Sequence, residues 1–282
     1  MSANRVVVGV DGSPTSFEAL DAAAVEARLR GAELELVYCV ADVDESGPIL
    51  RSAATRVGER SPGLPVVMTA VVGDPAEVLA ERGRSAALTV VGTRGLGGFA
   101  GLLMHSVSQR LAAHADGPVL VVRGGDVRGD LRRDRPGGVL LGLESDDDAD
   151  AALFAFEEAG QRGARLEVLH AWTYRQSANG TPGSFAAEPV AERVARQAAA
   201  KAAFPGQIVT PLRTAYPRLP VQIRSIRSTP CRALIEATAN ADLVVIAAHR
   251  RHSRRGIQLG PVTHALLHHS SCSVAIVPVV EG

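Results

Sequence analysis

An internal repeat limits the folds that this chain can adopt more than any other feature of its sequence. Leu64–Val66 (Leu-Pro-Val) recurs as Leu219–Val221, and Gly9 recurs as Gly142, at a shorter separation along the chain. Matches before the third strand keep the shorter separation and later matches keep the longer one. This pattern predicts two copies of one fold, with an insertion in the second copy.

The repeat divides the chain into two domains joined by a linker. Residues 126–137 are rich in glycine and charge and show no apolar periodicity, which is typical of a linker. We therefore expect a first domain at 1–125, a second domain at 138–282 and an insertion in the second domain at about 172–217. A chain of 282 residues is long enough for two domains of ordinary size.

Within each copy, strand-length apolar runs alternate with helical segments. In the first copy we expect strands at 5–10, 33–40, 66–72, 88–91 and 119–122, and helices at 15–30, 49–60, 75–82 and 106–114. In the second copy we expect strands at 139–143, 166–170, 221–226, 243–246 and 274–277, and a longer helix at about 187–203 before a proline-punctuated insertion. This alternation predicts an α/β fold: two doubly wound, five-stranded parallel sheets in tandem, of Rossmann-like type.

The composition argues against several classes of protein. Lys plus Arg equals Asp plus Glu, 30 each, whereas a dedicated nucleic-acid-binding protein normally carries a basic excess. No apolar run approaches the roughly 20 residues that a membrane-spanning helix needs, and no secretory signal precedes the first strand. The three cysteines are scattered and form neither a disulfide framework nor a zinc motif. We therefore expect a cytoplasmic protein with no nucleic-acid partner, no membrane partner and no metal site.

Two loops carry the residues that predict a binding site. Ligands of doubly wound sheets bind beyond the carboxyl ends of the strands, which here means the loops after the first and fourth strands. Asp11 follows the first strand, where its carboxylate can accept hydrogen bonds from a ribose or an adenine amine, although helix capping by Asp11 or Ser13 is the simpler explanation of these residues alone. The glycine-rich segment 92–98 follows the fourth strand and leads to Ser106, which opens a helix. Glycines let backbone N–H groups approach a phosphate, and a helix N-terminus favours an anion.

The order of these motifs resembles the universal stress protein family, over essentially both domains. The resemblance is carried by Val7–Ser13, Val90–Gly98, Ser106–Ser108, Pro118–Val122 and Gly260–His269. It implies a fold like that of the adenine-nucleotide alpha-hydrolases and a role in the stress response without catalysis, with weak ATP hydrolysis left open. It also implies ATP, with Mg²⁺, as the ligand.

In ATP-binding members of this family the phosphate motif is Gly, two residues, Gly, nine residues, Gly, then Ser or Thr. Gly92, Gly95 and Ser106 fit this motif, but His105 stands where the third glycine is expected and adds a side chain there. The resemblance implies that Asp11 holds the ribose or adenine and that Cys39 flanks the adenine. The candidate nucleotide-binding set, with no catalytic residue, is Asp11, Gly12, Cys39, Gly92, Arg94, Gly95, His105, Ser106 and Val107.

The second domain departs further from the motif. Glu144 corresponds to Asp11, Ala247 and Arg250 stand where two glycines are expected, and Pro261 replaces the serine and lacks an N–H donor. We expect this domain not to bind ATP but to serve pairing and stability. We interpret the basic segment 249–255 as a solvated loop in place of the lost phosphate loop.

Two copies in one chain predict an intramolecular pseudo-dimer. The fifth strands often pair across the dimer in this family, which places 119–122 alongside 274–277 and covers two sheet edges that otherwise invite aggregation. Whether two chains associate further, as a homodimer, is left open by the sequence.

Three functions fit these residues. The first is a non-catalytic regulator that senses adenine nucleotide through the first domain and acts by binding protein partners, which the sequence does not identify. The second is an interaction module that has lost nucleotide binding, favoured by His105 and the degenerate second domain. The third, an adenylating enzyme like the ATP pyrophosphatases, would need a Ser-Gly-Gly-x-Asp-Ser loop at a strand end, which Val10–Ser13 does not supply.

Overall fold

The structure, a computed structural model, describes residues 4–40, 47–93, 106–124, 138–174, 190–253 and 256–279. The first domain contains β1 (Arg5–Gly9), α1 (Pro14–Arg30), β2 (Glu33–Val40), α2 (Gly47–Arg60), β3 (Val66–Val72), α3 (Pro75–Gly83), β4 (Leu88–Gly92), α4 (Val107–His114) and β5 (Val119–Val122). The second contains β6 (Gly138–Leu143), a short 3₁₀ helix (Asp146–Asp148), α5 (Ala149–Arg162), β7 (Arg165–Trp172), α6 (Val190–Ala215), β8 (Val221–Arg227), α7 (Pro230–Thr238), β9 (Leu243–Ala248), β10 (Arg250–Ser253), β11 (Gly256–Leu259), α8 (Pro261–His269) and β12 (Ser273–Pro278).

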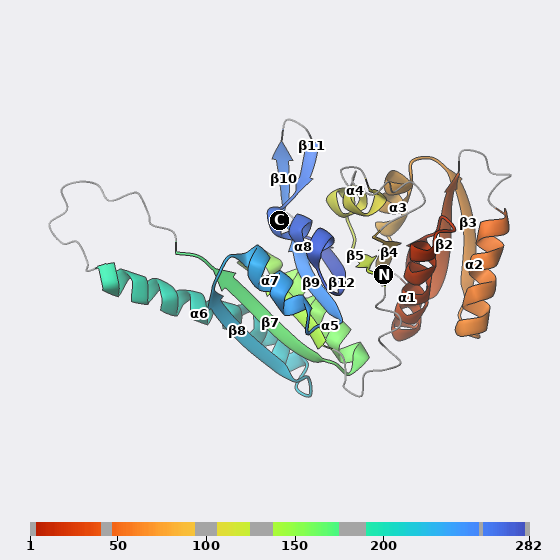
Figure 1. Cartoon of the computed structure of the whole chain (residues 1–282). Helices are drawn as coiled ribbons and strands as arrows, with labels where there is room; N and C mark the ends of the chain where they lie inside the picture. The colour runs from red at the N-terminus through yellow and green to blue at the C-terminus, as the bar shows by residue number, and fades with distance from the viewer. Residues whose placement is uncertain are drawn as a thin grey trace.

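The strands of both domains form one ten-stranded sheet, in the order β3-β2-β1-β4-β5-β12-β9-β6-β7-β8 (Figure 1). Each half is parallel and doubly wound, as the sequence predicts. The halves meet where β5 and β12 pair antiparallel, with Val121 opposite Val274 and Val119 opposite Ile276. The predicted pairing of the two fifth strands is therefore confirmed.

Helices cover both faces of this sheet, which is why its central strands are nearly continuous apolar runs. One core lies under α1, α2, α5 and α6 and runs without a break from one domain into the other. The second lies under α3, α4, α7 and α8. Aromatic residues make up only 4% of the chain, so Val, Leu and Ala fill most of both cores.

A buried cluster of four charges links α1 to α5. Glu26 and Arg30 of α1 correspond in the repeat to Glu158 and Arg162 of α5. Arg30 and Arg162 each donate to both carboxylates, and the distance from Arg162 Nη2 to Glu158 Oε2 is 2.8 Å. Glu26 is 3% and Glu158 2% exposed. Burial, and then the neighbouring charge of Glu26, raises the pKa of Glu158. The cluster thus joins the halves symmetrically on one face of the sheet.

A second set of contacts joins the halves on the other face, between α4 and α8. Gln109 Nε2 lies 2.8 Å from His268 Nε2. Arg123, just after β5, donates to the backbone carbonyl of His268 at 2.7 Å and to that of Ser270. Because both faces and the strand pairing hold the halves together, the described parts of the chain form one packed body.

The long helix of the second domain corrects one expectation. We expected it to end near residue 203, but α6 continues through two prolines to Ala215. Pro205 has no N–H for the carbonyl of Lys201, one turn earlier, which normally ends a helix. Here Ser225 of β8 donates its hydroxyl to that carbonyl at 3.0 Å. A tertiary contact therefore replaces the lost helical hydrogen bond.

The basic segment 249–255 corrects a second expectation, because most of it is not a loop. β10 and β11 form an antiparallel hairpin in which Arg250 lies opposite Leu259. The apolar alternation of Ile257 and Leu259 is the strand signal that sequence reasoning overlooked. Part of the predicted insertion, residues 175–189, lies outside the described residues. Among the described helices, none is long and apolar enough to cross a membrane.

Candidate functional site

The strand registers bring predicted residues of three strands to one edge of the sheet. Gly9, the last residue of β1, lies opposite Val37 of β2, so Asp11 just after β1 and Cys39 near the end of β2 lie toward the same edge of the sheet. On its other side β1 pairs with β4, whose last residue is Gly92. From β1 the chain adds β2 and β3 on one side, and then it crosses back to add β4 and β5 on the other side of β1. The carboxyl ends of β1 and β4 therefore form the switch point of the first domain.

The turn after β1 fixes the Asp11 carboxylate. Asp11 Oδ1 accepts a hydrogen bond from the backbone N–H of Ser13 at 2.9 Å. Ser13, and not Asp11, caps α1, since its hydroxyl accepts from the N–H of Ser16 at 3.1 Å. Gly12 between them has a φ of +81°, a conformation that favours glycine. Capping therefore explains Ser13 and leaves Asp11 at the strand end in a preformed turn.

Gly92 is required by packing. A Cβ atom at Gly92 would lie 2.7 Å from the backbone oxygen of Thr15, in the first turn of α1. The end of β4 therefore lies so close to the start of α1 that a residue with a Cβ atom does not fit at position 92. The phosphate contact implied by the family motif is not needed to explain this glycine.

Ser106 and Val107, the last two residues of the candidate nucleotide-binding set that the structure describes, lie at the start of α4. Ser106 caps the helix, and its hydroxyl accepts from the N–H of Gln109 at 3.3 Å. Val107 is the first helical residue and packs against the core under α3 and α4. The partial positive charge of the helix N-terminus is thus set just after the predicted phosphate loop. Arg94, Gly95 and His105 lie outside the described residues.

Cys39 is half-buried at the end of β2. Burial raises the pKa of its thiol, the Asp74 carboxylate raises it further, and Arg82 lowers it. The thiol is therefore protonated at neutral pH and is a poor nucleophile. A neutral, half-buried sulfur beside the strand end suits contact with an aromatic base better than covalent chemistry.

A buried carboxylate and a half-buried histidine meet at the corresponding edge of the second domain. Asp148 is 1% exposed, and its Oδ2 accepts from the N–H groups of Glu144 and Ser145 at 2.5 and 3.2 Å. Its Oδ1 lies 2.8 Å from Nε2 of His249, which follows β9. This hydrogen bond is the largest cause of a raised pKa of His249. The pair spans the ends of β6 and β9, the counterparts of β1 and β4.

Sequence reasoning missed this pair, because His249 was interpreted as part of a solvated loop and Asp148 was given no partner. Asp148 is the repeat counterpart of Ser16, at the same separation that relates Glu158 to Glu26. In the first domain Ser16 is buried, and its hydroxyl donates to the backbone carbonyl of the capping serine at 2.9 Å. A carboxylate in place of a buried hydroxyl demands a cationic partner, and that substitution was the available signal.

His170 fills the end of β7 in the same domain. It is 2% exposed, its Nδ1 lies 3.0 Å from the carbonyl oxygen of Leu143, and its ring lies 4.8 Å from that of Phe204. Burial lowers the pKa of His170, so the ring is neutral. Among the described residues, no group of three His, Cys, Asp or Glu side chains is placed to hold a metal ion.

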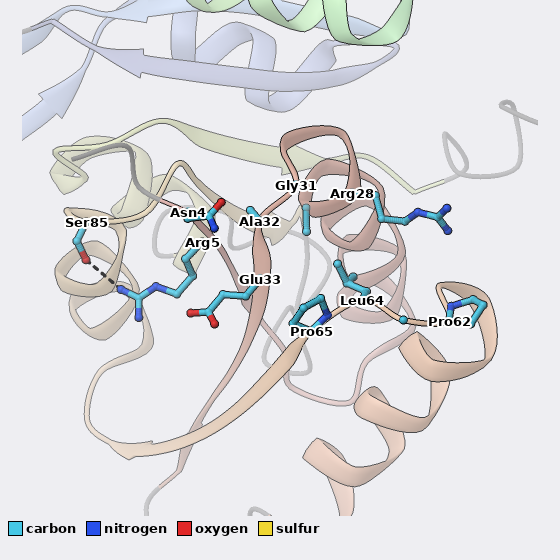
Figure 2. Close-up of a pocket in the computed structure, with 12 residues that line it drawn as sticks. Asn4, Arg5, Arg28, Gly31, Ala32, Glu33, Pro62, Leu64, Pro65 and Ser85 are labelled. Atoms are coloured by element: carbon cyan, nitrogen blue, oxygen red, sulfur yellow. Dashed lines mark hydrogen bonds between the residues drawn. The ribbon is translucent and has the colours of Figure 1, made fainter.

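A surface hollow of about 890 Å³ lies at the opposite edge of the first domain (Figure 2). Its wall includes Arg5, Gly31, Glu33 and Leu64, which stand at or near the amino ends of the strands. In Figure 2 the Arg5 guanidinium reaches toward Ser85, whose Oγ is 3.0 Å from Nη2. This hollow cannot be the predicted nucleotide site, which lies at the carboxyl ends.

Comparisons with known proteins agree with this architecture. The sequence model of the universal stress protein family matches the chain twice, over residues 3–123 and 138–278. A universal stress protein of Mycolicibacterium smegmatis is 30% identical over 295 residues, which cover 96% of this chain and 96% of the relative. One from Mycobacterium tuberculosis is 30% identical over 298 residues, which cover 98% of this chain and 95% of the relative. The crystal structure of a universal stress protein from Archaeoglobus fulgidus covers 99% of this chain and 100% of its own, with a TM-score of 0.63 at 16% identity, and has the same fold.

Proposed function

This chain belongs to the universal stress protein family, and we propose that it is a non-catalytic, cytoplasmic regulator whose first domain binds adenine nucleotide. The first domain (1–125) is the sensor, residues 126–137 are a linker, and the second domain (138–282) is a structural partner. ATP with Mg²⁺ is the proposed ligand. It lies over Asp11, Gly12 and Cys39 at the base end, and its phosphates reach the segment from Gly92 to Val107.

The observation that carries this proposal is the difference between the two equivalent edges. In the second domain the Asp148–His249 pair bridges the ends of β6 and β9. In the first domain the small hydroxyl of Ser16 stands at the position of Asp148 and turns back to its own helix. The same fold therefore has one edge filled by its own side chains and one edge with a carboxylate, Asp11, in a preformed turn.

The residues at this edge favour binding over catalysis. The Cys39 thiol is held protonated by burial, and the Asp11 carboxylate already accepts from the Ser13 N–H. The thiol is a poor nucleophile in this form, and the Asp11 carboxylate is held by the turn in a position to accept hydrogen bonds from a ligand. A regulator that reports nucleotide binding to a protein partner needs only the binding step.

One observation favours the alternative, an interaction module without nucleotide. At the second domain's edge that corresponds to the predicted nucleotide site, the Asp148–His249 pair joins the ends of β6 and β9. His105, in place of the motif's third glycine, extends the same trend to the first domain. The two functions are distinguished by whether the first domain binds ATP.

The test is isothermal titration of nucleotide-stripped protein with ATP and Mg²⁺. Asp11→Ala should weaken binding at least about tenfold, since a charged hydrogen-bond acceptor contributes about 1.5–3 kcal/mol. Glu144→Ala, at the corresponding position of the second domain, is the matched control and should leave binding unchanged. Absence of binding by the native protein, with binding gained by His105→Gly, would instead support the interaction module.

A further inference from the structure

The two outer strands of the ten-stranded sheet differ in chemistry. β3 and β8 end the strand order, at opposite ends of the sheet in Figure 1, so each has one side without a strand neighbour among the described residues. β8 has the sequence Val-Gln-Ile-Arg-Ser-Ile-Arg, with two arginines. β3 has the sequence Val-Val-Met-Thr-Ala-Val-Val, with no charge, proline or glycine. Proteins block edge strands with charge or proline, so β8 is protected and β3 is not.

The side chains of β3 are unusually exposed for their chemistry. Val67 is 43%, Met68 52% and Val72 59% exposed. These are three of the five exposed large apolar side chains in the described part of the chain. Neighbours on a strand point to opposite faces, so Val67 and Met68 extend the apolar surface to both faces of the edge.

The backbone of β3 also has hydrogen-bonding groups that point away from the sheet. The carbonyl of Pro65 accepts from the N–H of Leu34 in β2 at 2.9 Å. In a parallel pair, alternate residues direct both their N–H and C=O groups to the same neighbour. The odd-numbered residues therefore face β2, and the outward groups belong to Val66, Met68, Ala70 and Val72.

We propose that this edge binds a second copy of the chain, with β3 of one chain antiparallel to β3 of the other about a twofold axis at Thr69. In that register Val66 lies opposite the partner's Val72, and Met68 lies opposite the partner's Ala70. The four outward residues of each strand then exchange about eight N–H···O bonds across the interface, two for each hydrogen-bonded pair. Every opposed pair is uncharged, so no charge is buried without a partner.

The residues of β3 and β8 favour a β3–β3 contact over the two other edge-to-edge contacts that two chains could make. The same twofold register on β8 would set Arg224 opposite its own copy, and like charges directly opposite destabilise a sheet. A β3–β8 contact would be head-to-tail and would leave an open edge at each end of the assembly, whereas a β3–β3 contact closes.

The chain already uses this geometry once. β5 and β12 join the two domains through antiparallel pairing of strands from two parallel sheets, over three residue pairs. A β3–β3 contact offers a strand of seven residues. It would extend the sheet through two chains and cover the apolar edge in the way that β12 covers β5.

Sedimentation velocity of the full chain tests this proposal, over two decades of concentration up to about 100 µM. At the upper end the native protein should sediment with twice the 29.4 kDa mass of one chain, and it should dissociate on dilution. Met68→Lys should weaken the dimer at least about tenfold, because the new charge lies within the apolar interface. Gln222→Lys, an exposed residue on β8, is the matched control and should leave the dimer unchanged.

Other results would overturn the proposal. A native protein that stays at 29.4 kDa throughout, a Met68→Lys protein that still dimerises, or a dimer lost in Gln222→Lys would each do so. Thermal melting confirms that each variant is folded, and Val72→Lys, at the most exposed position of the strand, replaces Met68→Lys if that variant does not fold. Hydrogen exchange gives an independent check, because the amides of Met68 and Ala70 should become protected only in the dimer.

Discussion

Replacing Glu26 by glutamine should destabilise the protein by about 2–3 kcal/mol. Glu26 accepts from Arg30 and Arg162, so the change leaves two guanidinium groups against one remaining carboxylate, Glu158. Removing one partner of a buried ion pair costs about 3–5 kcal/mol. The Arg30 and Arg162 side chains are 11% and 24% exposed and can turn partly toward water, which lowers that cost to about 2–3 kcal/mol. The melting temperature should fall by about 5–10 °C.

Urea denaturation followed by circular dichroism measures this loss. Glu236→Gln is the matched control, since Glu236 pairs with Arg232 one turn away on a helix, but both side chains are exposed. An exposed pair of this kind contributes less than about 0.5 kcal/mol. If Glu26→Gln costs no more than Glu236→Gln, the buried cluster does not stabilise the junction of α1 and α5, and the reasoning fails.

The same cluster predicts a pH dependence. Burial and the charge of Glu26 raise the pKa of Glu158 above its ordinary value of 4.5. The folded protein then holds the Glu158 proton at a pH where the unfolded chain has lost it. This carboxyl group therefore stabilises the fold less as pH rises from 4.5 through the raised pKa. Across that window, the unfolding free energy of the native protein should fall relative to that of Glu158→Gln as pH rises. A relative increase would contradict a raised pKa of Glu158.

Three further changes test other parts of the structure. The bond to Asp148 raises the pKa of His249 above 6.5, so the stability from this pair is complete below 6.5 and is lost as pH rises through the raised pKa; urea titrations of His249→Gln should lack that loss. Gly92→Ala should cost about 1–3 kcal/mol in thermal melts, because the new Cβ would lie 2.7 Å from a backbone oxygen of α1, and unchanged melting would count against the close approach. Ser225→Ala should cost about 1 kcal/mol, and less in a Pro205→Ala background that restores the helical N–H; equal costs would show that the hydroxyl does not replace it.

The fold could be predicted from the sequence because its signals are local and repeated. The strand runs, the repeat matches and the glycines at the helix ends each depend on a few neighbouring residues. Gly31 and Gly163, for example, both end a helix at a φ of +60°. The repeat predicted a pseudo-dimer, and the family resemblance implied that β5 would pair with β12, which the register confirms.

The parts that sequence reasoning missed depend on contacts distant in the chain. α6 continues past Pro205 only because Ser225, on another strand, supplies the missing hydrogen bond. The Glu26–Glu158 cluster exists only because α1 and α5 lie side by side, and neither helix alone calls for it. Only the repeat, which pairs these carboxylates, could have indicated it.

The candidate site shows the same division. Asp11 was placed at this sheet edge by strand order and Cys39 by the family resemblance; in the structure Asp11 follows β1 and Cys39 lies near the end of β2. The packing reason for Gly92 and the closure of the second domain by Asp148 and His249 require side chains of two elements to meet. Their chemistry is visible in the sequence, but their partners are not.

We propose that only the first domain binds nucleotide, and the number of nucleotides that one chain holds tests this proposal. Equilibrium dialysis of nucleotide-stripped protein against ATP and Mg²⁺ measures this stoichiometry. We expect about one nucleotide for each chain, since the Asp148–His249 pair spans the equivalent edge of the second domain. Two nucleotides for each chain would contradict the closure of the second domain, and none would contradict nucleotide binding by the first.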